Sequence, residues 1–580
     1  MSRFSNFLLV LLLFVSASAG ATTYYIDSVN GNDNASGLEE SLAWQSFAKV
    51  KSFKENQGFQ LGDTIKLACG SKWNDSLDFR NSSYKAFPSI ITADENCSEK
   101  PTIIGSDRLN GWTQLERKES ATIYYKDLDS SVSQLFVNGD AIRMARYPKS
   151  GYLHVSSDSV SQDDCFPPVD AIDPSSSFAP HKYVGSCYFS SGNDLAIPEN
   201  ESLSGAFVAI RTAEYWIDRR KVASNSNGIV EWENKTRYMP KAGHNYYLEN
   251  KLWMLNEVTQ DEWVFDAQIG RVYLALIDDS LGPRDPDENI TVDASVRDYG
   301  IIAMDTQDIK ISNIAIKHSA NHGIYLKSVD RTEIHNVEIS ESGEDGIYQL
   351  LIPESISIRK SKIINSRRDA IKLLESDSAE VNIEENLVSG SGVTDFNLGS
   401  PRESYAAIFA EDLSALIKNN TVIESGYIGV RIGLGSSVIQ NIVSDSCIAL
   451  SDCGGIYTRH HPRSYLDPWP LLADSSIISQ NIVTNSDEGV HTQSSSYGIY
   501  LDDWSNNVAV KQNTVSGYSS GILIHLAQNN LVRENTLYGN KNQQIYITEN
   551  LDPDYEGMVY NNRIYSNNIF PTKVQTPISL

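Results

Sequence analysis

The chain of 580 residues is poor in positive charge and in sulfur. It holds 48 Lys and Arg residues against 74 Asp and Glu residues, so its formal net charge at pH 7 is −26. A field of this sign repels polyanions, and we therefore expect neither nucleic acid nor an anionic membrane surface as a partner. The six cysteines form no Cys-x-x-Cys pair and no pattern with histidine, which disfavours a structural metal site.

Long apolar runs are also scarce, and the one at the start of the chain is short. Arg3 precedes the apolar run Phe7–Val15, and the small residues Ala17-Ser18-Ala19 follow it. The run is too short to span a bilayer, whereas its flanks are typical of a cleaved secretory signal. We predict that residues 1–19 are a signal peptide, that the mature protein is secreted or periplasmic, and that it has no membrane span.

The cysteines are even in number and all lie beyond this signal, in what we expect to be an oxidising compartment. Pairing of sequence neighbours would give three disulfides, although fifteen connectivities are formally possible. They are Cys69, Cys97, Cys165, Cys187, Cys447 and Cys453.

A repeat occupies the second half of the chain. A small residue, an aliphatic residue and usually a large side chain recur, mostly about every 23 residues, as between Gly300 and Gly323. This period is too short for helix-pair repeats and fits one coil of a β-solenoid. The copies begin at Gly300, Gly323, Gly346, Ala370, Ala407, Gly429, Gly455, Gly498, Gly521 and, more weakly, Gln544.

A second periodic pattern accompanies the first and contains asparagine. An aliphatic residue, two variable residues, Asn, any residue and another aliphatic residue recur, as in Ile417-Asn420-Val422. Stacked Asn amides would satisfy one another at a turn, so we interpret these residues as structural. The Asn positions are 386, 420, 441, 481, 513, 535 and 562.

The beginning of the mature chain carries a resemblance to a known superfamily. A short strand at 23–26, a turn rich in Gly, Asn and Asp at 30–37, and the spacing Trp44-x-x-Phe47-x-x-Val50 resemble the N-terminal cap of secreted right-handed parallel β-helix proteins of the pectate-lyase-like superfamily. The resemblance implies an all-β protein with a cap and first strands at 22–110 and a right-handed parallel β-helix at 291–580. It also implies a carbohydrate-active protein.

Between these parts, residues 111–290 lose the 23-residue period. Leu135–Val137 precedes Asn138-Gly139, and Glu262–Asp266 precedes Arg271–Leu274, which are patterns typical of β-hairpins. We predict a β-sandwich-like insertion. Similar insertions in several β-helix glycoside hydrolases pack beside the solenoid and wall the cleft.

The alternation of a strand after each Gly-Ile pair predicts which side chains point outward. The first outward column runs from Ile302 to Tyr546, and the second changes from apolar to ionisable residues between Glu411 and His525. Extra residues near 391–404 and 459–496 flank the same stretch. Rings beside charged groups suit a sugar site, although the charges could also form only a cross-strand ladder.

The candidate catalytic residues are Asp502 together with Asp503 or Asp452. Carboxylates on neighbouring coils, about 4.8 Å apart, approach the spacing of a glycosidase pair, with one as nucleophile or base and the other as acid. Asp452 lies several residues before the register of Asp502, so the partner stays open. The candidate substrate-binding residues are Arg459, His525, Arg431, Tyr457, Tyr500, Glu411, Lys372 and His460.

These observations favour a secreted glycoside hydrolase that acts on a polysaccharide or oligosaccharide as a monomer and without a cofactor. One alternative is a polysaccharide lyase, in which Lys372, Arg431, Arg459 or His525 would serve as base or cation. The resemblance includes Ca²⁺-binding lyases, so Ca²⁺ is a possible ligand of this alternative. The other alternative is a β-helix that binds glycans without catalysis.

Overall fold

The structure is a computed structural model, and it describes residues 20–80, 88–156, 186–190, 195–199, 201–226, 228–233, 236–280, 282–374, 379–393, 405–411, 414–459, 475–486, 495–549, 559–570 and 578–579. The predicted signal peptide at 1–19 and His460 lie outside these residues, as do residues 394–404 of the first predicted addition and residues 460–474 and 487–494 of the second. Across the described residues, no helix combines the length and the apolar character that a membrane crossing requires.

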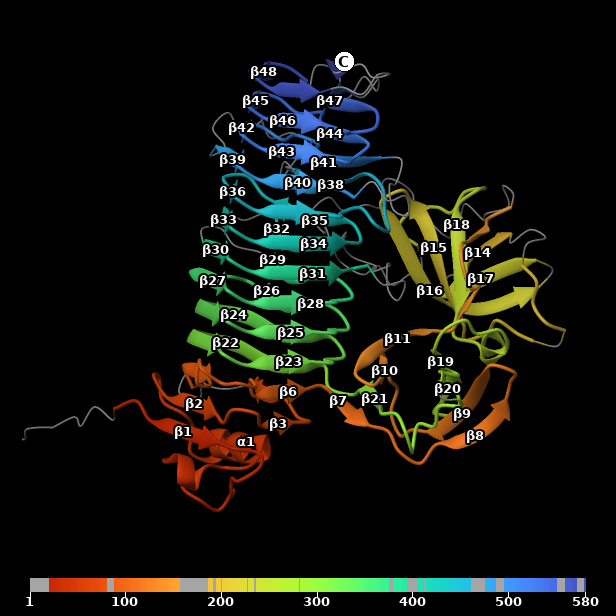
Figure 1. Cartoon of the computed structure of the whole chain (residues 1–580), viewed down its shortest axis with the longest axis vertical. Helices are drawn as coiled ribbons and strands as arrows, with labels where there is room; N and C mark the ends of the chain where they lie inside the picture. The colour runs from red at the N-terminus through yellow and green to blue at the C-terminus, as the bar shows by residue number, and fades with distance from the viewer. Residues whose placement is uncertain are drawn as a thin grey trace, which may run out of the picture.

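From Tyr299 onward the chain winds into stacked coils whose strands pair in parallel, as predicted (Figure 1). The first face of each coil contains the strand of the Gly-Ile repeat. Its strands are β22 (Tyr299–Ser312), β24 (His322–His335), β26 (Ile347–Leu350), β29 (Ile371–Leu374), β32 (Ala406–Ala410), β35 (Ile428–Ile432), β38 (Cys453–Thr458), β41 (Ser496–Leu501), β44 (Ser520–His525), β47 (Gln543–Thr548) and β50 (Ile578–Ser579).

Two further faces complete the coil. β22 and β24 are long enough to continue into the second face, so the first two faces form one sheet. The second face otherwise contains β27 (Ser355–Arg359), β30 (Glu380–Glu384), β33 (Ala415–Lys418), β36 (Ser437–Ile439), β39 (Ser476–Ser479), β42 (Val508–Lys511), β45 (Leu531–Arg533) and β48 (Arg563–Tyr565). The third contains β3 (Lys72–Trp73), β6 (Thr102–Ile104), β23 (Ala315–Lys317), β25 (Glu338–Ser340), β28 (Lys362–Ile364), β31 (Leu387–Ser391), β34 (Thr421–Ser425), β37 (Ile442–Ser444), β40 (Ile482–Thr484), β43 (Thr514–Ser516), β46 (Thr536–Tyr538) and β49 (Asn568–Phe570).

The Gly-Ile repeat is explained by the narrow interior of the coil. The aliphatic residues of successive copies pair with one another, as Ile456 does with Ile499, and they are fully buried. A Cβ atom at Gly323 would lie 2.5 Å from Cγ2 of Ile339 on the third face. The small residue is therefore required because the first and third faces meet there.

The asparagine pattern forms a buried ladder, as its interpretation as structural implied. Each side chain donates from Nδ2 to Oδ1 of the next, with Asn441 to Asn481 at 3.0 Å and Asn481 to Asn513 at 2.9 Å. The last step differs from the prediction, because Asn535 donates to Asn567, while Asn562 bonds to Asn530 in a separate column. Ile564-Asn567-Ile569 has the same spacing, so the last copy of the pattern was assigned five residues too early, at Asn562 instead of Asn567.

The N-terminal segment covers the open end of the solenoid. It contains β1 (Thr23–Ile26), η1 (Glu40–Leu42), α1 (Phe47–Asn56), β2 (Thr64–Leu67), β4 (Leu77–Phe79) and β5 (Ile90–Thr92). β1 pairs with β2, β2 with β5, and β5 with β22, which continues the parallel sheet. Trp44 and Phe47 are buried in the core that this segment shares with the coils.

Two of the three sequence-local disulfides are present, Cys69–Cys97 and Cys447–Cys453. Cys165 lies outside the described residues, so the third pairing stays a prediction.

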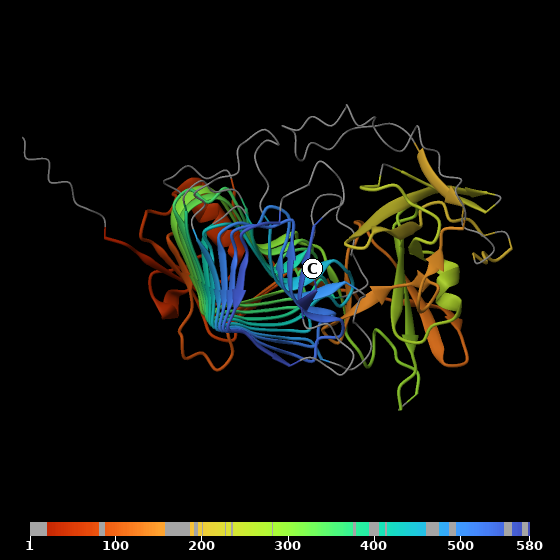
Figure 2. The same cartoon turned by 90° about the horizontal axis from the view of Figure 1, so that it is seen from above.

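Residues between β6 and β22 form two largely antiparallel sheets beside the solenoid (Figures 1 and 2). The first contains β7 (Ser106–Arg108), β8 (Thr113–Arg117), β9 (Ala121–Asp127), β10 (Leu135–Val137), β11 (Asp140–Met144), β19 (Glu262–Asp266), β20 (Arg271–Ile277) and β21 (Val292–Ser295). The second contains β12 (Arg146–Tyr147), β13 (Leu153–His154), β14 (Ser186–Ser190), β15 (Phe207–Ala213), β16 (Trp216–Ser226), β17 (Ile229–Glu233) and β18 (Asn245–Glu249), with η3 (Leu252–Asn256) following. Both predicted hairpins are confirmed.

One apolar cluster joins the two sheets of this insertion. It includes Val264 and Tyr273 of the first sheet and Val208 and Tyr246 of the second. The two sheets therefore share a core, whereas the sandwich-like arrangement and the independence of this part as a domain stay predictions.

The ladder predicts a specific loss of stability. Replacing Asn481 with Ala removes bonds to Asn441 and Asn513 and leaves buried amide groups unpaired, so the free energy of unfolding should fall by about 2–4 kcal/mol. Denaturant unfolding measures this change. Asn542→Ala, at an exposed position of a later coil, is the control and should stay within about 0.5 kcal/mol of the wild type; equal stability of both variants would contradict the role of the ladder.

Candidate active site

The insertion covers part of the first face of the solenoid. Ala209, Ile217 and Tyr247 of the insertion form one cluster with residues of the outward column, including Tyr457 and Tyr500. The outward direction of this column is as predicted, because Arg431, Tyr457, Tyr500 and Leu523 pair in register. Pointing out of the coil does not expose these rings, however, since Tyr457 and Tyr500 are only 5% and 3% exposed beneath the insertion.

Asp502 is the most constrained carboxylate of this face. It follows β41 directly, and Tyr457 on the preceding coil donates its hydroxyl to Oδ2 at 2.6 Å. Nδ1 of His525 on the following coil lies 2.8 Å from Oδ1. Burial alone would raise the pKa of Asp502, but the bonds from His525 and Tyr457 outweigh it and lower the pKa. Asp502 is therefore ionised at neutral pH.

His525 belongs to a small charged network. Its Nδ1 is also 3.4 Å from Asp503, and Arg459 lies 3.5 Å from the other oxygen of Asp503. Burial disfavours the imidazolium, yet the bonds and charges of Asp502 and Asp503 raise the pKa of His525 to about 9. His525 is therefore a cation at neutral pH.

A turn before β38 brings Asp452 close to Asp502. It immediately precedes β38, its φ is +54°, and the disulfide Cys447–Cys453 closes the turn around it. The Tyr500 hydroxyl donates to Oδ1 of Asp452 at 3.1 Å, and the Tyr427 hydroxyl donates to its backbone oxygen at 2.8 Å. The residue thus lies within reach of Asp502 despite its different position in the repeat.

The pKa of Asp452 is shifted in the direction opposite to that of Asp502. Burial, followed by the negative charge of Asp502, raises the pKa of Asp452 to about 6. The two tyrosines that hold these carboxyl groups touch, with ring centroids 5.2 Å apart. Asp452, one of the two partners that the sequence left open for Asp502, thus has a pKa shifted away from that of Asp502.

Arg431 and Glu411 support this arrangement from the adjacent coils. Arg431 pairs with Glu411 at 2.6 Å, and its guanidinium lies 5.0 Å from the ring centroid of Phe409 and 5.2 Å from that of Tyr457. Both ionic groups are largely buried. They brace Tyr457, which in turn holds Asp502.

Lys372 was predicted to contact substrate, but the structure buries its charge. Its side chain is fully buried, and Nζ lies 3.2 Å from Asp369, which is also fully buried. The ammonium group therefore takes part in an interior ion pair and is not presented to a substrate. Alternation along a strand shows which side chain points out of the coil, but not what is packed over it.

The insertion contributes residues that the sequence did not single out. Tyr215 lies near enough to Asp452 and Arg459 for their charges to act on it, and its ring meets Tyr238 edge to face at 5.6 Å. Glu214 adds to the negative potential at Asp452. These residues follow β15, outside the repeat, so no periodicity marks them.

Asp502, Asp503 and His525 are also close enough together to be tested as ligands of a metal cation. Asp502, Asp503 and His525 offer one ligand atom each within 4.8 Å of one another. Both oxygens of Asp502 already bond to Tyr457 and His525, and Ca²⁺ prefers oxygen ligands over imidazole. This donor set does not fit Ca²⁺ well, and the absence of a cofactor stays a prediction.

Comparisons with known proteins agree with the fold. Residues 299–467 and 471–575, a little under half of the chain, match the family model for a right handed beta helix region. The structure of a protein titled glycoside hydrolase superposes with a TM-score of 0.58 at 12% identity, over 94% of this chain and 97% of that one. A complex of XylC with xylose covers 91% of this chain and 68% of its own at 12% identity, with a TM-score of only 0.38.

One curated relative is similar in sequence. A lacto-N-biosidase of Bifidobacterium longum subsp. longum is 27% identical over 159 residues, which are 27% of this chain and 9% of that protein. The chain thus matches only a small part of that relative's length. Together with the pairing of the strands, the family match confirms the right-handed parallel β-helix.

The network around His525 predicts its titration. The imidazole should titrate near pH 9 in the wild type and at a lower pH in Asp502→Asn, because the variant loses the bond and charge that raise the pKa. NMR titration of the histidine side chains measures both values. Because the pKa is raised on folding, the stabilisation by this pair is complete below pH 6.5 and is lost as the pH rises through about 9. A wild-type midpoint near 6.5 would contradict the network.

Proposed function

We propose that this β-helix protein is a secreted glycoside hydrolase whose catalytic pair is Asp502 and Asp452. The observation that carries the proposal is the separation of their pKa values, which is lowered at Asp502 and raised to about 6 at Asp452. Two neighbouring carboxyl groups whose pKa values are shifted in opposite directions are what acid and base roles in glycoside cleavage require. The name of the full-length structural neighbour and that of the bifidobacterial relative support the same reaction class.

In this mechanism, Asp452 in its acid form protonates the glycosidic oxygen as the bond to the anomeric carbon breaks. Asp502, ionised and fixed by Tyr457 and His525, acts on the opposite side as the nucleophile or as the base that activates water. The His525 cation and the Tyr457 hydroxyl keep the charge of Asp502 oriented. NMR analysis of the first anomer released distinguishes the retaining from the inverting course.

The lyase alternative is less well supported by the same geometry. A lyase needs a neutral base for the proton beside a uronate carboxylate and a cation for that carboxylate. His525 is protonated at neutral pH, and Lys372 and Arg431 are engaged with Asp369 and Glu411. A lyase would release an unsaturated product that absorbs ultraviolet light, whereas a glycan-binding protein would release no product.

The pH dependence of the reaction follows from the two carboxyl groups. The acid must be protonated, so kcat/KM should fall as the pH rises through about 6, the pKa of Asp452. At acidic pH, kcat/KM should fall only below the usual pKa of a carboxyl group, because Asp502 must be ionised and its pKa is lowered from 3.8. Initial rates between pH 3 and 9 on oligosaccharides, whose leaving group needs protonation by the acid, measure both limbs. Activity that stays constant across pH 6 would contradict Asp452 as the acid.

Substitutions separate the two roles. Asp502→Asn should lower kcat by more than about 10³-fold on every substrate. Asp452→Asn should lower it by about 10²–10⁴-fold on oligosaccharides and less on 4-nitrophenyl glycosides, because nitrophenolate leaves with little protonation. Asp305→Asn, an exposed carboxylate on a distant coil, is the matched control. Full activity of Asp502→Asn with a retained fold would remove this residue from the site.

A further inference from the structure

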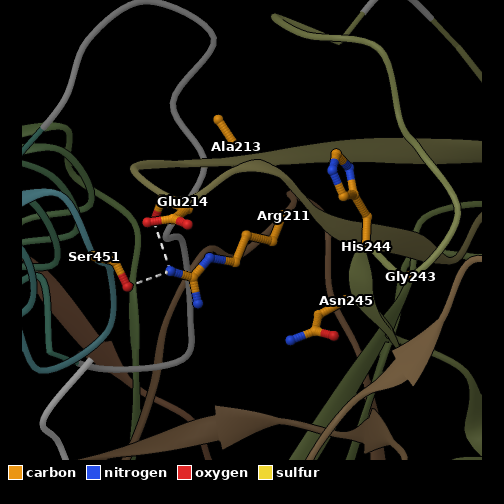
Figure 3. A pocket seen from close by; sticks show the side chains of 7 residues that line it. All are labelled: Arg211, Ala213, Glu214, Gly243, His244, Asn245 and Ser451. Atoms are coloured by element: carbon orange, nitrogen blue, oxygen red, sulfur yellow. Dashed lines mark hydrogen bonds between the residues drawn. The ribbon is translucent and has the colours of Figure 1, made fainter. Parts of the chain in front are cut away.

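A polar cavity lies where the insertion meets the solenoid (Figure 3). Its volume is about 340 Å³, and it is open to solvent on one side. The insertion lines it with Arg211 of β15, Glu214 of the turn that follows, and His244 and Asn245 at the start of β18. The solenoid contributes Ser451. This volume is within the range of small-ligand sites in proteins, about 300–1,000 Å³.

The cavity is fixed next to the proposed acid. Ser451 is the residue before Asp452, and its backbone N–H donates to the carbonyl of Glu214 at 3.0 Å. Arg211 Nη2 donates to the same carbonyl at 2.6 Å and to the Ser451 hydroxyl at 3.0 Å, as Figure 3 shows. Movement of the β15–β16 turn relative to Asp452 would break these bonds. The cavity therefore has a defined position relative to the catalytic pair.

The lining offers several donors and one carboxylate. Nδ1 of His244 accepts the backbone N–H of Lys241 at 3.1 Å, which leaves the ring proton on Nε2. Burial, followed by the charges of Lys241 and Arg211, lowers the pKa of His244, so the ring is neutral at neutral pH. Arg211 and Asn245 add further N–H groups, and Glu214 adds acceptors. Such a mixture matches the hydroxyl groups of a neutral sugar.

The cavity can bind either the sugar whose bond is cleaved or the leaving group, depending on which of the two carboxyl groups lies beside it. In glycoside cleavage, the general acid protonates the oxygen that departs with the leaving group. The lining of the cavity includes Ser451, the residue before Asp452, whereas Asp502 lies on the next coil between Tyr457 and His525. A group that occupies the cavity is therefore on the leaving-group side.

We infer that the insertion provides the leaving-group subsite, in which Arg211, His244 and Asn245 bind a neutral sugar unit. This inference rests on the proposed function, and it deepens it by making the substrate an oligosaccharide or polysaccharide with a sugar, not a small aglycone, as the leaving group. The β-sandwich-like part then selects the substrate, while the solenoid carries the reacting carboxyl groups.

The test compares two leaving groups on one glycone. For a glycone that the wild type cleaves, kcat/KM is measured with the 4-nitrophenyl glycoside and with the matching disaccharide and trisaccharide. Asn245→Ala and Arg211→Ala should lower kcat/KM about tenfold or more on the oligosaccharides, mainly through KM, and less than about twofold on the aryl glycoside. Asn245→Ala leaves the Arg211–Ser451 contact intact, which keeps the test valid if Arg211→Ala folds poorly.

Arg271→Ala is the matched control, since Arg271 lies in the other sheet of the insertion and pairs with exposed Asp127. It should leave both substrates unaffected. An equal loss on aryl and sugar leaving groups, or no loss on either, would overturn the subsite while leaving the hydrolase proposal standing. Wild-type protein that cleaves no glycoside would instead contradict the proposed function itself.

Discussion

The in-register stacking of parallel strands is the constraint on which the rest of this structure depends. Each coil repeats the hydrogen-bonding direction of the one before, so residues at equal phase lie directly above one another, about 4.8 Å apart. The buried aliphatic column and the Asn ladder hold that register, because a slip of one residue would move Ile456 out of the core and break the bonds of Asn481. The register places Tyr457, Tyr500 and His525 on adjacent coils of one face.

The proposed catalytic residues lie where the insertion covers this regular surface. The solenoid supplies Asp502 with two fixed bonding partners, and the turn closed by Cys447–Cys453 brings Asp452 beside it. The insertion then removes water from the face, which strengthens the charges within it and raises the pKa of Asp452. Asp502 accepts hydrogen bonds from the His525 cation and from Tyr457, whereas Asp452 accepts one from the Tyr500 hydroxyl and faces the charge of Asp502, and this difference separates their pKa values.

Much of the fold could be predicted from the sequence because it is repetitive. The spacing between Gly300 and Gly323 defines a coil, and the alternation after each Gly-Ile pair gives the correct outward column. The site could be predicted only in part. Asp502 and His525 share the repeat phase and were found by aligning copies, whereas Tyr215 and Glu214 lie in the insertion, where no period marks a position. For Lys372 the predicted outward direction is correct, but its ion pair with the buried Asp369 could not be predicted from the alternation along the strand.

The sequence by itself determined the local and periodic features, which are the coil length, the core column, the Asn column and the face that bears Asp502. These depend on contacts between residues about 23 positions apart, so a repeated pattern is enough to specify them. The tertiary structure alone decided that Asp452 accepts a hydrogen bond from Tyr500, that the outward rings are buried, and that Arg211 lies beside Ser451. These features depend on the packing of a non-repeating insertion against the solenoid, some 240 residues away in the chain at the Arg211–Ser451 contact.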